Sequence, residues 1–432
     1  MRIFSLLFIL FLSACTSTKQ TEQAEQPKTC DLAYSRYQAT VTGYCQEAVA
    51  DLLESVPTIE KEIEIRAVDE IPELFWYSRL MKYSLVKQDN KAPMAFVIAG
   101  TGASYKSAKM IALQKILYQQ GYHVLSISSP TFSNYIINAT TNNDVPGDLS
   151  RDADTLYTVM QQVLKQVQEE DDVEVSGFSL TGYSLGGAHS AFISLLDEEK
   201  KVFNFEKVVL INPPVSLYNS VSVLDSYLDL KNDRHAVIGM YEKVFDRFSE
   251  GYANQESSSL TEGSIYSLFK DAQLTDEELK LLIGTSFRLS STDMMFAIDV
   301  TYNLGAFIYK NHDISKFESI THSMQRAGDA TFTQYFEKAM VPWSQKHDPS
   351  VTRESLIEKL SLRSIEDYLK NSEKITMVTN ADDIILIEGE VEYLQGVFQE
   401  RAKIFERGGH CGNMDRVSFV DYMRGQFQGV NL

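Results

Sequence analysis

The chain has 432 residues, of which 44% are hydrophobic and 23% are charged, and its formal net charge is −19. This composition is typical of a folded globular protein and excludes a largely disordered chain. So acidic a surface repels phosphate groups, which excludes nucleic acid as an expected partner. It repels anionic membranes too, so contact with a bilayer requires an anchor.

The N-terminal segment has the three parts of a secretory signal. Arg2 provides the positive start, residues 3–12 form an almost wholly apolar run, and the tetrapeptide LSAC ends at Cys15. The run is too short to span a membrane. Its end resembles a bacterial lipobox, which implies that Cys15 becomes the first mature residue and carries acyl chains such as palmitate. The alternative is a plain signal peptide whose cleavage removes Cys15.

We therefore expect residues 1–15 to direct export and to leave the protein lipid-anchored to a bacterial membrane, on the periplasmic or surface face of the outer membrane in a Gram-negative cell. Residues 16–29 are polar without an apolar rhythm, which predicts a flexible tether. In an oxidising compartment, a disulfide between Cys30 and Cys45 is expected and Cys411 is left over. Three free buried thiols are the alternative.

Strands and helices alternate in the first part of the predicted core, residues 30–215. Strand patterns occupy residues 79–87, 94–99, 123–128, 175–183 and 207–212, and helical patterns occupy residues 106–120, 148–167 and 186–196. This alternation predicts an α/β fold with a mostly parallel central sheet and helices on both faces.

Residues 216–371 interrupt the alternation with an almost entirely helical pattern. Within them, Thr275 and Glu278 have the spacing of a capping box that opens a helix. We interpret this segment as an inserted helical domain. It can have its own small core and it can cover an active site as a cap, and the two are compatible. Strand and helix patterns return in residues 372–432, which we assign to the second part of the core.

The strongest chemical signal is the sequence GYSLGG at residues 182–187. It follows a predicted strand and opens a predicted helix, which is the context of a nucleophile elbow. In that turn the serine is strained, and flanking glycines give it room. We predict that Ser184 is a nucleophile; the alternative is a glycine-rich turn with an idle serine.

The helix after Ser184 should favour an oxyanion through its N-terminal amides and its dipole. We predict that Leu185 N–H is one oxyanion donor. The second donor is expected from the loop after strand 94–99, where the sequence GTG lets the backbone approach a substrate, and Thr101 is the candidate. An ordinary glycine-rich turn is the alternative for that loop.

A serine nucleophile needs a base, and His410 is the histidine that fits. It follows two glycines after a short late strand, in a loop near the C-terminus. His189 lies in the helix after Ser184 and is expected to pack or cap there. The other histidines begin a strand or lie in the helical insertion without metal-ligand spacing: His123, His235, His312, His322 and His347. We therefore predict no metal site.

The acid that orients His410 should follow the predicted strand at residues 374–378, where Asp382 and Asp383 are adjacent. Neighbouring carboxylates point in different directions, so one is expected to reach the histidine and the other to be solvated or to cap a turn. Asp383 directly precedes an apolar pair whose burial should fix its direction. We predict that Asp383, rather than Asp382, contacts His410.

The order Ser184, Asp383, His410, with VIAGTG, GYSLGG, TNADDII and a final GGHCG, resembles the α/β-hydrolase superfamily, and within it bacterial lipoproteins and esterase-like proteins with a helical insertion. Many relatives have His-Gly where this chain has Ala99-Gly100. The resemblance implies acyl transfer from an ester to the serine and then to water, with no metal and no organic cofactor.

The expected substrates are carboxylic esters, either acyl lipids or small esters. Two other functions compete with this hypothesis. One is a peptidase or amidase with the same triad, and the other is a non-catalytic lipoprotein that binds a ligand or partner through its cap.

Overall fold

In the computed structural model of this chain, the residues described are 34–43, 49–140, 144–228, 234–253, 262–310 and 314–428. The predicted lipid anchor at Cys15, the tether at residues 16–29 and the predicted Cys30–Cys45 disulfide lie outside them. Cys411 is a free, buried thiol. No helix within the described ranges has both the length and the apolar character needed to cross a bilayer.

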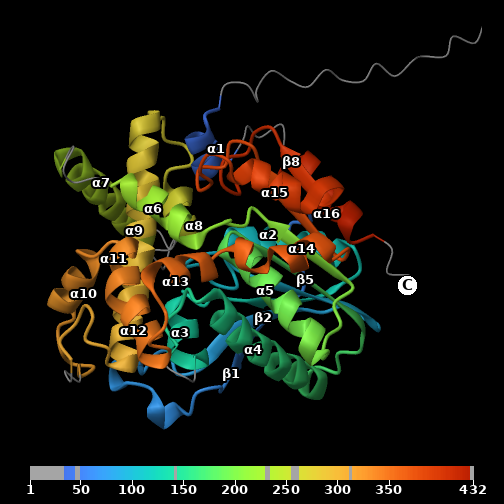
Figure 1. The fold of residues 1–432 in the computed structure, drawn as a ribbon, viewed down its shortest axis with the longest axis horizontal. Helices are drawn as coiled ribbons and strands as arrows, with labels where there is room; N and C mark the ends of the chain where they lie inside the picture. Colours follow the sequence, from blue (N-terminus) through green and yellow to red (C-terminus); the bar gives the residue numbers. More distant parts are fainter. Residues whose placement is uncertain are drawn as a thin grey trace, which may run out of the picture. The chain divides into compact units, whose positions relative to one another are not determined.

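Within the described residues, a central sheet of eight strands carries the fold (Figure 1). Its order is β1-β2-β4-β3-β5-β6-β7-β8, with antiparallel pairing of β2 to β1 and β4 and parallel pairing elsewhere. The strands are β1 (Thr58–Ile63), β2 (Met81–Val86), β3 (Ala92–Ile98), β4 (His123–Ile127), β5 (Val175–Tyr183), β6 (Lys207–Ile211), β7 (Ile375–Asn380) and β8 (Ala402–Phe405).

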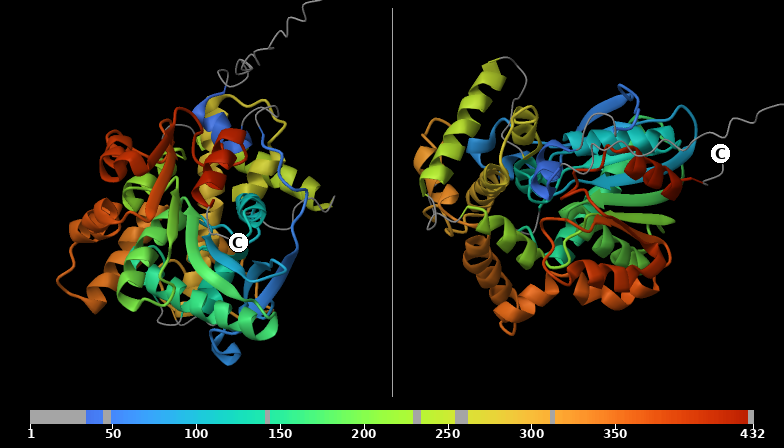
Figure 2. Two further views of the ribbon diagram at one scale, coloured as in Figure 1. Left: turned by 90° about the vertical axis from the view of Figure 1, so that its right-hand side faces the viewer. Right: turned by 90° about the horizontal axis from the view of Figure 1, so that it is seen from above.

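Helices cover both faces of the sheet (Figure 2), so its central strands are apolar on both sides. Along β3, Met94 and Phe96 face a cluster shared with α3, α4, α5 and α15, whereas Ala95 and Val97 face a cluster shared with α2 and α16. These helices are α2 (Ala108–Gln119), α3 (Ser133–Ala139), α4 (Leu149–Glu170), α5 (Leu185–Lys200), α15 (Glu390–Phe398) and α16 (Val417–Gln426). The predicted fold class is confirmed.

The segment between β6 and β7, which we call the cap, is helical throughout its described regular elements and appears in green to orange in Figure 1. The capping box from Thr275 to Glu278 is present at the start of α9. The helices are α6 (Leu217–Ser226), α7 (Arg234–Ala253), α8 (Glu262–Leu268), α9 (Asp276–Tyr302), α10 (Thr321–Gly328), α11 (Phe332–Tyr335), α12 (Val341–His347), α13 (Arg353–Lys359) and α14 (Glu366–Asn371).

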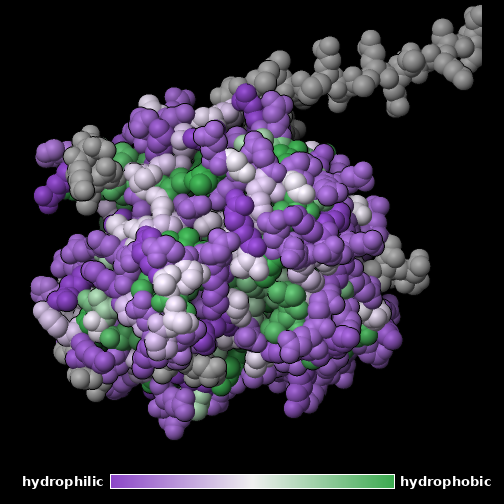
Figure 3. Space-filling model, viewed as in Figure 1, coloured by the Kyte–Doolittle hydropathy of each residue, from purple (hydrophilic) through white to green (hydrophobic). Residues whose placement is uncertain are grey.

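The cap shares its apolar core with the sheet. Phe287 and Phe296 of α9 belong to the same buried cluster as Leu180 of β5 and Leu210 of β6. This part of the cap is therefore packed on the core. A second buried cluster joins α7, α8 and the first turns of α9 to Tyr37, Val41 and Ile384. On the outside, the face drawn in Figure 3 is mainly hydrophilic with scattered hydrophobic side chains, as the acidic composition requires.

Two elements near the start of the described chain were not predicted from the sequence. The edge strand β1 contains Glu60, Lys61 and Glu62 and is largely exposed, so it has no apolar alternation to detect. The helix α1 (Arg36–Thr42) has seven residues, too few for a clear helical period. Both depend on tertiary contacts, and α1 contributes directly to the site described next.

Candidate active site

Ser184 occupies a sharp turn between β5 and α5. Its backbone has φ 54° and ψ −127°, a conformation that residues with a Cβ rarely adopt. Such a backbone costs on the order of 1–3 kcal/mol and persists when its surroundings hold it. Ser184 N–H donates to the Ile211 carbonyl at the end of β6 at 2.8 Å, which fixes the turn to the sheet.

The glycines around Ser184 are required by close backbone contacts. A Cβ on Gly182 would lie 2.3 Å from the Gly186 carbonyl oxygen, and a Cβ on Gly186 would lie 2.2 Å from the Ile98 carbonyl oxygen. Both distances are far inside van der Waals contact. The spacing of GYSLG is therefore explained by the approach of α5 to β3 and β5.

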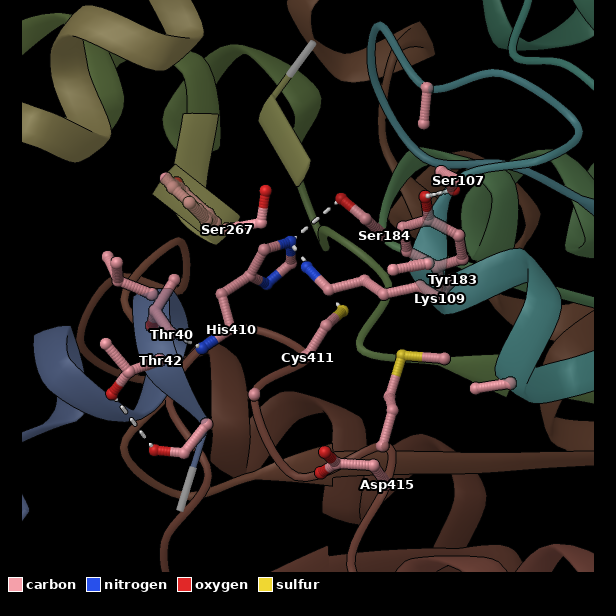
Figure 4. Close-up of a pocket in the computed structure, with 18 of the residues that line it drawn as sticks. Thr40, Thr42, Ser107, Lys109, Tyr183, Ser184, Ser267, His410, Cys411 and Asp415 are labelled. Carbon is pink, nitrogen blue, oxygen red and sulfur yellow. Dashed lines mark hydrogen bonds between the residues drawn. The ribbon is translucent and has the colours of Figure 1, made fainter. Parts of the chain in front are cut away.

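The structure brings together the three residues expected to form a triad. His410 Nε2 lies 2.9 Å from Ser184 Oγ, and the two side chains face each other in Figure 4. His410 Nδ1 lies 3.0 and 3.1 Å from the two carboxylate oxygens of Asp383. If Nδ1–H donates to this carboxylate, Nε2 is left as the acceptor for the Ser184 hydroxyl.

The Asp383 carboxylate accepts hydrogen bonds from two further donors, which orient it. Asn212 Nδ2 donates to Oδ2 at 2.8 Å, and Ile385 N–H donates to Oδ1 at 3.1 Å. Hydrogen bonds to the charged form stabilise a buried carboxylate. Sequence reasoning missed Asn212; its signal is its position just beyond β6, which pairs with the strand preceding Asp383.

Asp382 supports the loop that carries the histidine. Its Oδ1 accepts the Gly409 N–H at 2.9 Å, while Asn380 Nδ2 donates to the Gly409 carbonyl at 2.8 Å. Both polar groups of Gly409 are thus held by the end of β7. The two adjacent carboxylates have separate partners: Asp383 contacts the imidazole of His410, and Asp382 binds the backbone before it.

The N-terminal helix α1 holds the same loop from the other side. His410 N–H donates to Thr40 Oγ1 at 2.9 Å. A Cβ on Gly412 would lie 1.9 Å from the Ala39 carbonyl oxygen, so this position needs a glycine for α1 to pack against the loop. Sequence reasoning did not find Thr40, which is 370 residues from His410.

The two predicted oxyanion donors lie beside the serine. Leu185 begins α5, where backbone N–H groups have no acceptor within the helix. Thr101 follows β3 in a loop that Gly102 fixes by donating its N–H to Thr131 Oγ1 at 2.8 Å. Thr101, Leu185 and Ser184 line the same small cavity. The arrangement offers backbone donors where negative charge would develop on a substrate carbonyl.

His189, the other histidine near Ser184 in the sequence, has a structural role. His189 is fully buried, with Nε2 3.1 Å from Asp152 Oδ2, so it is part of the core beneath the cap. Among the described residues, no group of three or more His, Cys, Asp or Glu side chains is arranged to hold a metal ion.

The base has a strongly shifted pKa. Burial by itself lowers the pKa of His410, but the nearby Asp383 carboxylate outweighs it, and the pKa lies well above its usual value. The imidazolium form is therefore favoured at this position, which suits a residue that must hold a proton during acyl transfer.

No family model matches the sequence, and no curated protein matches it. Similar solved structures include the thioesterase domain from the curacin biosynthetic pathway (10% identity, 86% of this chain and 100% of that chain covered, TM-score 0.38). Another is a thermostable esterase from Pseudomonas putida (14% identity, 91% of this chain and 88% of that chain covered, TM-score 0.40). A third is an esterase from Pyrococcus furiosus (9% identity, 86% of this chain and 92% of that chain covered, TM-score 0.39). Likenesses this distant do not assign an activity, so function is inferred from the site itself.

We expect Asp383→Asn to reduce kcat by about 10⁴, because an amide favours the wrong imidazole tautomer. Asp382→Asn keeps an oxygen that can accept the Gly409 N–H, so its loss should be about tenfold or less. Ester hydrolysis by the two purified variants, with circular dichroism to verify folding, measures both effects. Equal losses, or the reverse order, would contradict the separate roles of the two carboxylates.

The pH dependence should report the raised pKa of His410. Because the base must be neutral to accept a proton, kcat/KM should rise through a pKa above the ordinary histidine value of about 6.5. Removing the carboxylate charge in Asp383→Asn should move this rise to lower pH, because Asp383 is the larger of the two groups that raise the pKa of His410, the other being Cys411. If kcat/KM of the variant rises at the same pH as that of the wild-type protein, a group other than His410 titrates.

Proposed function

We propose that this protein is a serine hydrolase that acts on carboxylic esters. The observation that carries the proposal is the alignment of Ser184 Oγ, at a strained backbone position, 2.9 Å from a histidine nitrogen whose ring is held by Asp383. Strain of this kind is typical of a nucleophile.

The reaction follows from the geometry. Ser184 Oγ attacks the ester carbonyl carbon while His410 Nε2 accepts the hydroxyl proton. The N–H groups of Leu185 and Thr101 stabilise the resulting oxyanion. When the C–O bond to the alcohol breaks, His410 returns the proton to the alcohol oxygen. Asp383 remains ionised and stabilises the imidazolium throughout.

The second half repeats these steps with water. His410 takes a proton from a water molecule, which attacks the acyl group bound to Ser184. Collapse of the second tetrahedral intermediate releases the carboxylic acid and restores the Ser184 hydroxyl. The residues named need no redox or group-transfer cofactor for this sequence.

Enclosure of the site favours a small ester over a polypeptide. Helices α6, α8 and α9 of the cap contribute walls around Ser184, and His410 is 8% exposed. A peptidase needs an open groove in which an extended chain passes the nucleophile in both directions. Here the serine lies between cavities of about 320 and 30 Å³, dimensions that suit a small molecule.

Ser184→Ala should abolish labelling by a fluorophosphonate probe and lower ester hydrolysis by several orders of magnitude. The fold should persist, because alanine adds no atoms to the turn. Ser194→Ala is the matched control: it removes a buried hydroxyl from the same helix α5, one that contacts Tyr368, and should keep labelling.

Gel fluorescence of the labelled proteins and initial rates on 4-nitrophenyl acetate read out the result. Continued labelling of a folded Ser184→Ala protein would place the nucleophile elsewhere. A wild-type protein that neither labels nor hydrolyses any ester would instead be a binding protein with an idle serine.

We also propose that acyl chains on Cys15 hold the enzyme at a bacterial membrane, with the substrate reached from the exported side. Support comes from the apolar run that ends in LSAC and from the polar residues 16–29 after it. Two or more acyl chains give stable anchoring, since each buried CH₂ contributes roughly 0.8 kcal/mol.

The anchor predicts an N-terminal peptide that begins at Cys15 and has the mass of added acyl chains. The intact protein should enter the detergent phase on phase separation, and Cys15→Ala should not. Cys30→Ala is the control, because it removes a thiol downstream of the lipobox and should still partition with detergent. An unmodified mature N-terminus beyond Cys15 in the mass spectrum would exclude the anchor.

A further inference from the structure

Ser184 lies where two unequal cavities meet. Both cavities have walls formed by Thr40, Thr101, Ser184, Tyr266 and His410. One has a volume of about 30 Å³ and the other about 320 Å³. An ester has two arms on its carbonyl carbon, so the difference in size bears on which arm enters which cavity.

The small cavity is apolar. Apart from the shared walls, its one polar side chain is Ser220, whose hydroxyl donates to the Ile385 carbonyl at 2.9 Å. The rest of its wall comes from the cap, from α5 and from the turn after β7, and includes Leu185, Leu217, Val221, Ile283, Phe287 and Ile384. Each of these six side chains is at most 5% exposed. Such a wall accepts hydrocarbon and offers nothing to a hydroxyl or a charge.

Its volume limits the length of that hydrocarbon. At about 30 Å³ it has roughly a tenth of the space of the large cavity, so it accepts only a short chain. The wall is close-packed: Phe287 stacks on Phe332 with ring centroids 5.6 Å apart. A longer chain would have to displace α6 or α9.

The large cavity has a mixed lining, in which apolar side chains alternate with polar and charged ones. The polar and charged side chains that it does not share with the small cavity include Ser107, Lys109, Ser267, Lys270 and Asp415, several of which are labelled in Figure 4. This lining suits an alcohol that carries both hydrocarbon and polar groups. At about 320 Å³ it has room for a group far larger than the small cavity can take.

The positions of the reacting atoms assign the two arms of the ester to the two cavities. The leaving alcohol must take its proton from His410 Nε2, and Cys411 Sγ, 3.9 Å from that nitrogen, lines the large cavity but not the small one. Leu185, the oxyanion donor, lines the small cavity but not the large one. The alcohol arm therefore occupies the large cavity and the acyl arm the small one.

We infer that the enzyme removes short acyl groups from a larger alcohol. This rests on the proposed function and narrows it, because long-chain acyl lipids do not fit. The step is ester plus water to a short carboxylic acid and the free alcohol. The bond between the acyl carbon and the alcohol oxygen breaks, and the alcohol oxygen leaves with the proton from Nε2.

Two substrate comparisons test the inference on the wild-type protein. Along 4-nitrophenyl acetate, butyrate and octanoate, kcat/KM should fall at least about tenfold at octanoate. Between the isomers benzyl acetate and methyl phenylacetate, which exchange the small and large arms, benzyl acetate should be preferred by a similar factor. Equal rates on acetate and octanoate would overturn the length limit, and preference for methyl phenylacetate would reverse the two cavities.

Variants of the wall connect the preference to the small cavity. Phe287→Ala should raise the octanoate-to-acetate ratio of kcat/KM by about tenfold, because it lengthens the cavity. Phe296→Ala is the matched control: it lies on the same helix α9, is equally buried at 4% exposed, and lines neither cavity, so the ratio should not change. Leu224→Ala, at a partly exposed wall position, gives the same test if Phe287→Ala fails to fold.

Different results would refute the acyl-length limit and the serine hydrolase activity. Fluorophosphonate labelling of Ser184 together with hydrolysis of acetate and octanoate at equal rates would refute the acyl-length limit and leave the serine hydrolase intact. A ratio that rises equally in Phe287→Ala and Phe296→Ala would remove the small cavity from the explanation. Absence of both labelling and hydrolysis would refute the proposed function itself.

Discussion

The close approach of the first turn of α5 to the ends of β3 and β5 is the constraint on which the site depends. Backbone atoms meet there without room for a Cβ on Gly182 or Gly186, and Ser184 has a positive φ where the chain turns from strand to helix. The same turn exposes the Leu185 amide and directs Ser184 Oγ to His410 Nε2. The strained backbone, the nucleophile and the oxyanion donor thus all belong to one turn. The buried core on both faces of the sheet stabilises that turn.

The remaining groups come from neighbouring strands of the same edge. Asn212 follows β6 and Asp383 follows β7, and parallel pairing of β6 with β7 places them within hydrogen-bond reach. Asp382 and Asp383 divide the work between them because successive side chains point in different directions. One carboxylate orients the imidazole of His410, and the other holds the Gly409 backbone. Substitution of Asp383 therefore affects the orientation of the His410 ring, whereas substitution of Asp382 affects the backbone just before His410.

Sequence predicted the parts of this site that are encoded locally. The strand–turn–helix pattern around Ser184, the glycines before His410 and the apolar pair after Asp383 are all readable within a few residues. Continuous apolar runs predict the buried strands of a parallel sheet. Thr40 and Asn212 were not predicted, because a lone threonine or asparagine has no local signature and gains its role from contacts across 370 and 171 residues. The unequal cavities were likewise beyond reach, since their shape depends on how the cap packs onto the core.

The hold of α1 on the histidine loop has a consequence for where the chain can be cut. Ser35 caps α1 by accepting the Gln38 N–H, and its hydroxyl reaches Asp276 in α9, so the helix is fastened to the cap as well as to the loop. A chain that begins just before Ser35 would keep both this cap and Thr40. A chain that begins after Thr40 would lack the acceptor of the His410 N–H, and the loop that carries the base would lose this support. The N-terminal limit of the part of the chain that supports the site therefore lies between Ser35 and Thr40.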